Sequence, residues 1–399
     1  MHSIHRQWLD MTDYMIFLEL FNDPLINYNE LSKKIGKSFQ FVRDRVSRLK
    51  RENFLRQDKE IIDPILGPRV QTEVEGVYSP QALGLQRIHV FFAGISGIEA
   101  EELLLKGLEA HPYTHFQVLT FSPKLGVYAQ FDIPEREIGF IKKYVKKMQE
   151  YSLFRDSHIL STNFSATSET RFEAWDRLVQ DWRIIEEPAV GQDKDVFSQQ
   201  FDTFREMGGR KEDLIAQDKS RIRQKKAKRF SELDLKLVRE LTINAKLSVK
   251  TLSSFYRKDP STISKKLKQI RQTLVPRALL YYDRSMFNLT QSLFIQGSFL
   301  SNEVRDQVLS FVKQRWFPFS SWLAVERKNF VWYVLLPPNL VADFLEFVNL
   351  NVRTLQVHYP QLRKSKTYFF YFKNYDFSKG EWITDPEYVI DEPLKAIEI

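Results

Sequence analysis

Residues 38–52, SFQFVRDRVSRLKRE, form a predicted helix with two different faces. Val42, Val46 and Leu49 recur at the spacing of a single helical stripe, which indicates that this side packs on a core. Ser38 precedes the stripe, and its hydroxyl is a typical cap for the first turn of a helix. The opposite face is free to contact a partner and carries Gln40, Asp44, Ser47 and Arg51.

This helix is basic, because Arg and Lys outnumber Asp and Glu along it, and a basic helix suits a polyanionic partner. Gly36 separates it from a shorter predicted helix over residues 28–35. Two helices joined by a tight turn are typical of a helix-turn-helix, in which the second helix enters the major groove of DNA. The alternative is a helix whose charges are merely solvated.

A second copy of this pattern occurs at residues 259–272, DPSTISKKLKQIRQ. Ile263, Leu267 and Ile270 stand 221 positions after the three apolar residues of the first stripe. Asp259 takes the capping place of the serine, and a proline follows at the first helical position, where its missing N–H costs nothing. The repeat predicts that the two helices and their turn are duplicated as a unit.

The composition is that of a globular protein with several cores. At 399 residues the chain is too long for one ordinary core, and 43% hydrophobic and 14% aromatic residues can fill several. It has no cysteine, so disulfides, thiolate catalysis and cysteine-bound zinc are excluded and a reducing compartment is indicated. A net charge of +8 favours anionic partners, and no apolar run is long enough for a bilayer. We expect a cytoplasmic protein.

Strand and helix patterns alternate after each helix-turn-helix. In the first half the order strand, helix, strand, strand, helix, strand is predicted at 87–96, 98–109, 114–121, 125–132, 135–149 and 154–162. In the second half the same order is predicted at 290–299, 302–313, 320–325, 330–336, 339–352 and 364–371. An offset of 204 positions aligns Val127 with Val331 and Tyr128 with Trp332. The order βαββαβ is that of a ferredoxin-like domain, whose sheet leaves one face open.

The predicted fold class is therefore α+β, a tandem duplication of a winged helix-turn-helix and a ferredoxin-like βαββαβ domain. The open faces of the two sheets are expected to cover each other, which makes the chain an intramolecular pseudo-dimer. The expected winged helices are 1–70, with a wing at 54–63, and 231–285. The expected ferredoxin-like domains are 80–165 and 286–372, and the remaining segments are an aromatic tail with a basic linker at 166–230 and a C-terminal tail at 373–399.

Each half ends in an aromatic segment. Residues 172–182, FEAWDRLVQDW, match residues 372–382, FKNYDFSKGEW, at an offset of 200, which indicates a tail that docks on a surface and closes each half. A chance match in an aromatic-rich chain is the alternative, and a platform for stacking bases is a weaker one. The linker ends in a basic run, 221–229, that either follows a phosphate backbone or is solvated.

These motifs together resemble the Lrp/AsnC family, the leucine-responsive and asparagine-operon regulators of bacteria and archaea. The resemblance rests on LDMTDYMIFLEL, NDPLINYNELSKKIGKS and FVRDRVSRLKRENFLRQ in the first copy, and on ELDLKLVRELTINAKLSVKTLSS and STISKKLKQIR in the second. It implies a DNA-binding transcriptional regulator. A family member usually has one such half and pairs with a second chain, whereas both halves lie in one chain here. The family's acidic effector turn is missing at 122–126 and 326–329, so we assign no effector residues.

We therefore predict a regulator of the Lrp/AsnC type that is not an enzyme, needs no cofactor and binds double-stranded DNA through two non-identical winged helices. The expected phosphate contacts are Arg45, Arg48, Arg51, Lys265 and Lys268. The expected base contacts are Gln40, Phe41, Arg43, Asp44, Ser261, Thr262 and Ser264, and Ser47 completes the DNA-binding set. No membrane partner is expected, an effector stays unidentified, and further homo-oligomerisation is left open.

Two other functions fit the same pattern. Siroheme decarboxylases resemble the same family fold, so an enzyme remains an alternative, and it would need a pocket with basic and histidine groups. The seven histidines show no clustered motif in the sequence, and Pro112 between His111 and His115 argues against a metal-binding helix face. The other alternative is a scaffold that holds protein or RNA partners through its winged helices.

Overall fold

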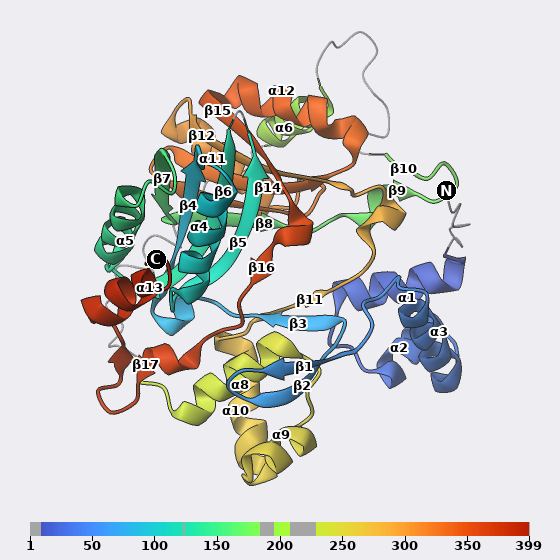
Figure 1. The fold of residues 1–399 in the computed structure, drawn as a ribbon. Coiled ribbons are helices and arrows are strands. Elements are labelled where there is room, and N and C mark those ends of the chain that lie inside the picture. Colours follow the sequence, from blue (N-terminus) through green and yellow to red (C-terminus); the bar gives the residue numbers. More distant parts are fainter. Residues whose placement is uncertain (1–8, 123, 184–194, 208–228, 399) are drawn as a thin grey trace. The chain divides into compact units, whose positions relative to one another are not determined.

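The structure, a computed structural model, divides the chain into two compact units (Figure 1). It describes residues 9–122, 124–183, 195–207 and 229–398. The first unit combines Met1–Leu83 with Phe230–Met286, and the second combines Gly84–Arg229 with Phe287–Ile399. We call residues before Phe230 the first half and the later residues the second half, so each unit contains a segment of both halves. Within the described ranges, no helix is both long enough and apolar enough to cross a membrane.

Three helices of the first half open the first unit: α1 (Met11–Asn22), α2 (Tyr28–Ile35) and α3 (Phe39–Arg51). The predicted cap of α3 is confirmed, because the Ser38 hydroxyl accepts a hydrogen bond of 3.2 Å from the backbone N–H three residues on. The predicted apolar stripe is confirmed as well, since Val42, Val46 and Leu49 are buried. The sequence therefore predicts this helix correctly, together with the face that it turns to the core.

Three helices of the second half belong to the same unit: α8 (Glu232–Ile243), α9 (Val249–Tyr256) and α10 (Pro260–Thr273). Asp259 caps α10, as predicted. An ion pair of 2.6 Å between Lys266 and Asp234 joins α10 to α8. At positions 221 residues earlier, Arg45 and Asp13 form a pair of 3.2 Å that joins α3 to α1. The same helix contact thus occurs in both halves.

A β-hairpin follows α3, but it begins later than predicted. It consists of β1 (Lys59–Asp63) and β2 (Gly67–Gln71), with a turn in which the Asp63 carboxylate accepts bonds from two backbone N–H groups. The first strand of the wing predicted at 54–63 is wrong, because Leu55 lies outside the hairpin and forms an isolated β-bridge with Tyr282 of the second half. A further strand, β3 (Val74–Val77), pairs with β11 (Arg277–Leu280) of the second half.

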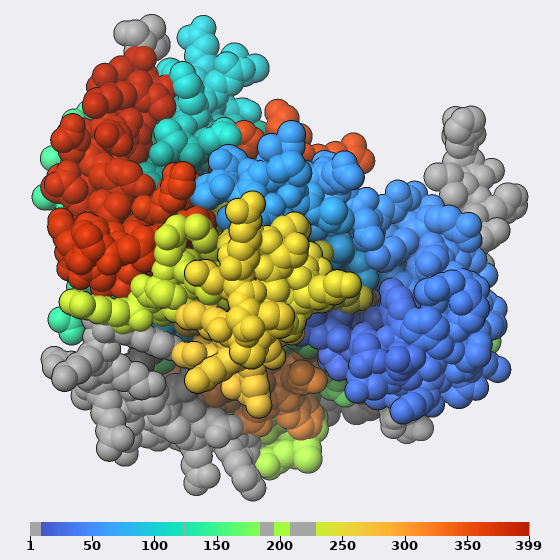
Figure 2. Space-filling view, turned by 90° about the horizontal axis from the view of Figure 1, so that it is seen from below, coloured from blue at the N-terminus to red at the C-terminus, as the bar shows by residue number. Residues whose placement is uncertain are grey.

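Buried ion pairs join the two segments of the first unit. Arg239 on α8 binds Asp63 at 2.6 Å, and both side chains are almost fully buried. Arg69 on β2 binds Glu240 at 2.8 Å in the same region. Gly76 on β3 comes so close to α8 that a Cβ atom would lie 2.7 Å from a backbone carbonyl oxygen. Figure 2 shows the two segments side by side, in blue and yellow.

The second unit is built around a sheet to which both halves contribute strands. The first half supplies β4 (Leu85–Ala93), α4 (Ile98–Ala110), β5 (Thr114–Phe121), β6 (Leu125–Pro134), α5 (Ile138–Glu150), β7 (Asp156–Ser161) and β8 (Phe164–Ser168). The second half supplies β12 (Gln291–Phe299), α11 (Asn302–Lys313), β13 (Ser321–Glu326), β14 (Asn329–Leu336), α12 (Val341–Asn351), β15 (Val352–Pro360) and β16 (Lys366–Thr367). The strand order is β7-β4-β6-β5-β15-β12-β14-β13-β8, and β16 also pairs with β5. The predicted α+β class is confirmed.

Strand faces from both halves meet in one apolar layer, which we call the inter-sheet layer. Its buried cluster consists of Phe91, Val118, Tyr128 and Leu160 of the first half and Phe294, Ala324 and Val331 of the second. The rings of Tyr128 and Phe294 lie 4.3 Å apart between their centroids, and those of Phe91 and Phe294 lie 6.3 Å apart. Because these contacts join the two halves, the layer needs both of them.

Two short strands cross between the halves, and the sequence did not predict these crossings. β8 pairs with β13, and β16 pairs with β5. The last strand predicted for the second half, at 364–371, is wrong, because the strand that pairs with β12 is β15, which begins where α12 ends. Most side chains of β15 are at least partly exposed, so its sequence lacks the apolar run that marks a central strand.

The offset of 204 positions places the matched strands one residue out of register. Tyr128 faces the inter-sheet layer, whereas Trp332 faces α12 on the other side of its sheet. Tyr333 packs on the layer instead, and it pairs with Phe294 as Tyr128 pairs with Phe91. A slip of one residue moves every side chain of a strand to the opposite face, so an offset of 205 is correct for this strand.

Each aromatic tail docks on the other half of the second unit. In the first tail, the Trp182 indole donates a hydrogen bond of 2.8 Å to the Phe287 carbonyl. In the second tail, the Ile383 carbonyl accepts a bond of 2.7 Å from the Tyr113 hydroxyl. The tails thus close the opposite half rather than their own. Their matched hairpins are β9 (Trp175–Asp176) with β10 (Asp181–Trp182) and β17 (Tyr375–Asp376) with β18 (Glu381–Trp382).

Helical segments extend both tails. α6 (Val196–Glu206) lies within the predicted linker 166–230 and packs against α11 and α12. Its buried stripe consists of Phe197, Phe201 and Phe204, a helical spacing that the linker interpretation overlooked. A π-helical turn, η7 (Glu387–Asp391), and α13 (Glu392–Lys395) lie against α5 and α4 (Figure 1). The basic run at 221–228 lies outside the described residues.

Candidate active site

Most residues that the sequence predicts to bind DNA are exposed on α3 and α10. The exposed members are Gln40, Arg43, Asp44, Ser47 and Arg51 on α3 and Ser261, Thr262, Ser264, Lys265 and Lys268 on α10. Phe41, Arg45 and Arg48 are only partly exposed. Several of the polar groups are already bonded to a neighbour on the same helix, as in the 2.9 Å bond from Gln40 to Asp44.

Two of the predicted phosphate contacts form ion pairs within the helical segment. Arg45 pairs with Asp10 and Asp13, and Arg48 pairs with Asp13 and Glu52. The side chain of Asp13 is 1% exposed, so its charge would lose its partners if both arginines turned toward a phosphate group. Arg45 and Arg48 therefore stabilise the packing of α3 on α1.

A polar cluster lies in the second unit, on the face of the first-half strands that is turned to the inter-sheet layer. Side chains alternate between the two faces of a strand, so Arg87, His89 and Phe91 of β4 share this face. On the neighbouring strand β6, the same face carries Tyr128, Gln130 and Asp132. The register of β4 and β6 thus brings polar side chains together beside an aromatic core.

Hydrogen bonds connect four side chains of this cluster. The Nδ1 atom of His89 lies 2.6 Å from the Tyr128 hydroxyl, and its Nε2 atom lies 3.0 Å from the Thr162 hydroxyl. The Gln130 amide donates a bond of 2.8 Å to the Tyr128 oxygen. With Gln130 donating to its oxygen, the Tyr128 hydroxyl can give its own proton to Nδ1 of His89, and in that tautomer the imidazole carries its proton on Nε2, next to the Thr162 hydroxyl.

Charged groups border these bonds. Arg87 binds the Asp132 carboxylate through two hydrogen bonds of 2.7 Å, and Nδ1 of His115 lies 3.9 Å from the same carboxylate. The pairing of β5 with β6 shifts between Thr114 and Phe116, and this irregularity lets His115 reach the cluster. The side chains of Arg87 and His115 are 27% and 19% exposed, so the cluster reaches solvent at this end.

Burial keeps both imidazoles neutral at neutral pH. It lowers the pKa of His89 to about 3, and the charge of Arg87 adds to the effect. Burial and Arg87 lower the pKa of His115 to about 4 in the same way. Burial raises the pKa of Tyr128 well above its usual value, so its hydroxyl keeps its proton. A neutral imidazole bonded to a hydroxyl can accept a proton on one nitrogen and release one from the other.

Aromatic rings from the second half cover the cluster. Trp322 on β13 stacks on His89, with ring centroids 5.1 Å apart and planes 25° apart. Phe294 lies against Tyr128 as part of the inter-sheet layer. Because the rings exclude water, a charge or hydrogen bond in the cluster acts through a low dielectric and is stronger than it would be in solution.

The sequence analysis found no clustered histidine motif, although the fold brings histidines into one site. His89 and Tyr128 are 39 residues apart in the chain and meet only because β4 pairs with β6. A signal was nevertheless present: RIHVF and YAQFD place polar residues at alternate positions of otherwise apolar strands. Alternation of that kind indicates polar groups on a buried face.

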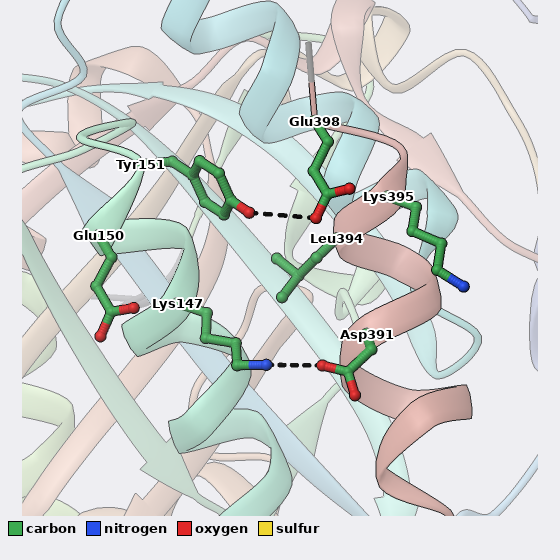
Figure 3. A pocket seen from close by; sticks show the side chains of 7 residues that line it. All are labelled: Lys147, Glu150, Tyr151, Asp391, Leu394, Lys395 and Glu398. Carbon is green, nitrogen blue, oxygen red and sulfur yellow. Dashed lines mark hydrogen bonds and ion pairs between the residues drawn. The ribbon is translucent and has the colours of Figure 1, made fainter.

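A separate hollow of about 320 Å³ lies at the surface between α5 and the C-terminal segment (Figure 3). Four of its polar groups form two pairs, because Lys147 binds Asp391 at 2.7 Å and the Tyr151 hydroxyl lies 3.4 Å from Glu398. The side chains of Lys147 and Asp391 are 46% and 48% exposed. Exposed pairs of this kind provide no desolvated reactive group, so the buried cluster is the better candidate site.

No protein-family model matches the sequence, and no curated protein matches it. The crystal structure of the siroheme decarboxylase NirDL is similar over 97% of this chain and 98% of its own, with a TM-score of 0.50 and 10% identity. Its complex with an iron-uroporphyrin III analogue covers 97% and 100% with the same TM-score and identity. AsnC of E. coli is similar over 39% of this chain and 92% of its own, with a TM-score of 0.28 and 16% identity.

The comparison contradicts the prediction of a transcriptional regulator that is not an enzyme. The structure that is similar along nearly the whole chain is that of an enzyme. At these identities the similarity concerns the fold. It nevertheless favours the enzyme alternative that the sequence left open over the regulator.

Proposed function

We propose that this chain is a decarboxylase that acts on a carboxylate side chain of a tetrapyrrole of the siroheme class. The observation that carries the proposal is the buried His89–Tyr128 pair next to Arg87 and Asp132. The whole-chain similarity to a siroheme decarboxylase supports the class of substrate. A cation that binds a carboxylate, placed beside a proton donor in a water-poor site, is suited to the loss of CO2.

The reaction breaks the bond between a carboxylate carbon and the neighbouring methylene carbon. CO2 leaves without the bonding electrons, which stay on the methylene carbon, and one proton then converts the methylene to a methyl group. The conjugated macrocycle of the substrate can delocalise that electron pair. No oxidant or reductant is consumed. The protein therefore has to bind the carboxylate, exclude water and deliver a proton.

The residues of the cluster divide these tasks. Arg87 binds the carboxylate of the substrate, and Asp132 holds the guanidinium in place. The Tyr128 hydroxyl and His89 form the proton-donating pair, and Thr162 fixes the tautomer of the imidazole. A carbanion is far more basic than either group, so the transfer is downhill even though burial keeps the tyrosine protonated.

The proposal includes the architecture inferred from the sequence, in which two copies of a winged helix-turn-helix and a ferredoxin-like domain pair within one chain. The recurrence of the Arg45–Asp13 ion pair as Lys266–Asp234 supports it. The matched hairpins of the two tails and the packing of strand faces in the inter-sheet layer support it as well. Such a duplication lets a single chain supply both walls of the site.

Anaerobic incubation of the purified full-length chain with siroheme, followed by mass spectrometry, tests the proposal. We expect the substrate to lose CO2 in a time- and enzyme-dependent manner. Tyr128→Phe removes the donated proton and should slow the reaction, whereas Tyr333→Phe changes the equivalent tyrosine of the second half and should not. A chain that binds siroheme and returns it intact would contradict the proposed function.

A further inference from the structure

The proton-donating pair of the candidate site is sealed from solvent. His89 and Tyr128 are 2% and 0% exposed. Arg87 lies two residues before His89 on the same strand face, and its side chain is 27% exposed. A substrate carboxylate can therefore reach the arginine in the described conformation, but it cannot touch the donating pair. One of the side chains that cover the pair has to move before the reaction.

The covering rings differ in how deeply they are buried. The imidazole of His89 has ring contacts with only two of the described side chains, Tyr128 and Trp322. Phe91 and Phe294, which cover Tyr128, are 4% and 2% exposed and are enclosed by other side chains. Trp322 packs on the same cluster but is only partly buried. It is therefore the ring that separates His89 from solvent.

Ring contacts alone hold the Trp322 indole in place. It lies 5.9 Å from Phe294 and 6.0 Å from Tyr333, measured between ring centroids, and its N–H donates to no described residue. The indole of Trp182, in contrast, donates a hydrogen bond of 2.8 Å to a backbone carbonyl. Rotation of a partly exposed indole without a hydrogen bond loses less burial than movement of an enclosed ring, and it leaves no polar group unpaired.

We propose that Trp322 is the gate of the active site: its indole turns away from His89 when the substrate binds, and this exposes the donating pair. The inference rests on the proposed function, because the gate serves the same site. Trp322 pairs with Thr167 of β8, which is exposed, and β8 is the last strand of the sheet. The indole can therefore turn at the edge of the sheet without displacing a further strand. In the closed position it keeps water away from the imidazole.

The rate at which siroheme binds tests the gate. Binding to the full-length chain is followed anaerobically by stopped-flow absorbance of the tetrapyrrole. Trp322→Ala should raise the association rate constant about tenfold, as expected if the open form is populated at about one tenth in the unaltered chain. Trp322→Phe keeps a smaller ring and should give an intermediate rate. A tryptophan that only fills space would not accelerate binding when it is removed.

A matched control removes a similar ring elsewhere in the second half. Trp316 is also partly exposed and packs on Phe204 at 5.8 Å, so Trp316→Ala should leave the association rate unchanged. Thermal unfolding verifies that each variant folds, and Trp322→Phe decides the question if Trp322→Ala does not fold. Unchanged or slower association in the Trp322 variants, or equal acceleration in the control, would overturn the gate alone. Failure of the unaltered chain to bind siroheme would overturn the proposed function as well, so the two failures are distinguishable.

Discussion

The two walls of the inter-sheet layer have the same strand pairing but different chemistry. On the first-half wall, Tyr128 bonds to His89 at 2.6 Å. On the second-half wall, the equivalent Tyr333 bonds to Ser292 at 3.2 Å. The strand register shows that His89 and Ser292 are equivalent. Phe91, two positions after His89, pairs with Tyr128, and Phe294, two positions after Ser292, pairs with Tyr333. The tyrosine of the first half therefore lies beside an imidazole that can exchange protons, and the tyrosine of the second half lies beside a serine hydroxyl.

The next pair in the same ladders shows the contrast again. Gln130, which donates to the Tyr128 oxygen, pairs with His89, whereas Leu335 pairs with Ser292. A buried amide lowers stability unless it is bonded, and a buried leucine raises it. The comparison teaches that one wall has kept packing as its main role while the other accommodates polar groups. Function in this unit is thus placed on one of two similar surfaces.

The largest expected difference between the two walls is in the rate of decarboxylation. His89→Ala removes the imidazole that is bonded to Tyr128, and general acid–base groups typically contribute about 10²–10⁴-fold to a rate. We expect the decarboxylation rate to fall by that factor. Ser292→Ala changes the equivalent position of the other wall and should alter the rate by less than about threefold.

Initial rates of CO2 release measure both variants, and thermal unfolding verifies that each one folds. Similar losses in the two variants would show that the walls share the chemistry. A larger loss for Ser292→Ala would place the site on the second-half wall.

A smaller difference between the two walls is expected in the free energy of unfolding. Leu335→Gln introduces an amide at a side chain that is 2% exposed, and it loses apolar burial as well. We expect the free energy of unfolding to fall by about 3 kcal/mol. Gln130→Leu loses a hydrogen bond to Tyr128 but gains apolar burial, so its cost should be about 1 kcal/mol. Urea denaturation measures both, and equal costs would contradict the assignment of polar and apolar walls.

The dependence of stability on pH follows from the histidines of the two walls. Burial lowers the pKa of His89 to about 3 and those of His115 and His358 to about 4, whereas unfolded histidine has a pKa of about 6.5. Between pH about 6.5 and 4 the unfolded chain binds more protons than the folded chain. Stability therefore falls as the pH falls through this window. The contribution of the neutral histidines to stability is fully present above pH about 6.5.

Each histidine contributes up to about 1.4 kcal/mol per pH unit within the window. The double variant of His89 and His115 to glutamine should therefore lose about twice as much of the slope as His358→Gln, which changes the second-half wall. Denaturation at several pH values measures the slope. An unchanged slope in the double variant would mean that these imidazoles are not buried in their neutral form.

Local structure could be predicted from the sequence where a short stretch specifies it. The stripe of Val42, Val46 and Leu49 and the cap at Ser38 predict α3 because helix period and capping act within a few residues. The crossing strands β8 and β16 could not be predicted, since each is short and its partner strand lies in the other half of the chain. Their position depends on tertiary pairing rather than on a local pattern.

The candidate site could be predicted only in part, for the same reason. The alternation in RIHVF shows that Arg87 and His89 share a strand face, but it does not show which residues lie opposite. The pairing of β4 with β6 selects Tyr128 and Asp132 as their neighbours. An offset wrong by one residue had aligned Tyr128 with Trp332, which faces away from the layer. The chemical difference between the walls was therefore invisible until the register was known.

The smallest expected effect tests whether the reaction occurs in the buried cluster or in the surface hollow. Lys147 and Asp391 form the ion pair of the surface hollow in Figure 3, and both side chains are about half exposed. Lys147→Gln should change the free energy of unfolding by less than about 0.5 kcal/mol, because exposed pairs contribute little. It should leave the decarboxylation rate unchanged, because the buried cluster and not this hollow holds the proton-donating pair. Rate measurements with siroheme settle the point: a loss of activity in Lys147→Gln would move the reaction to the hollow and remove the reason to contrast the two walls.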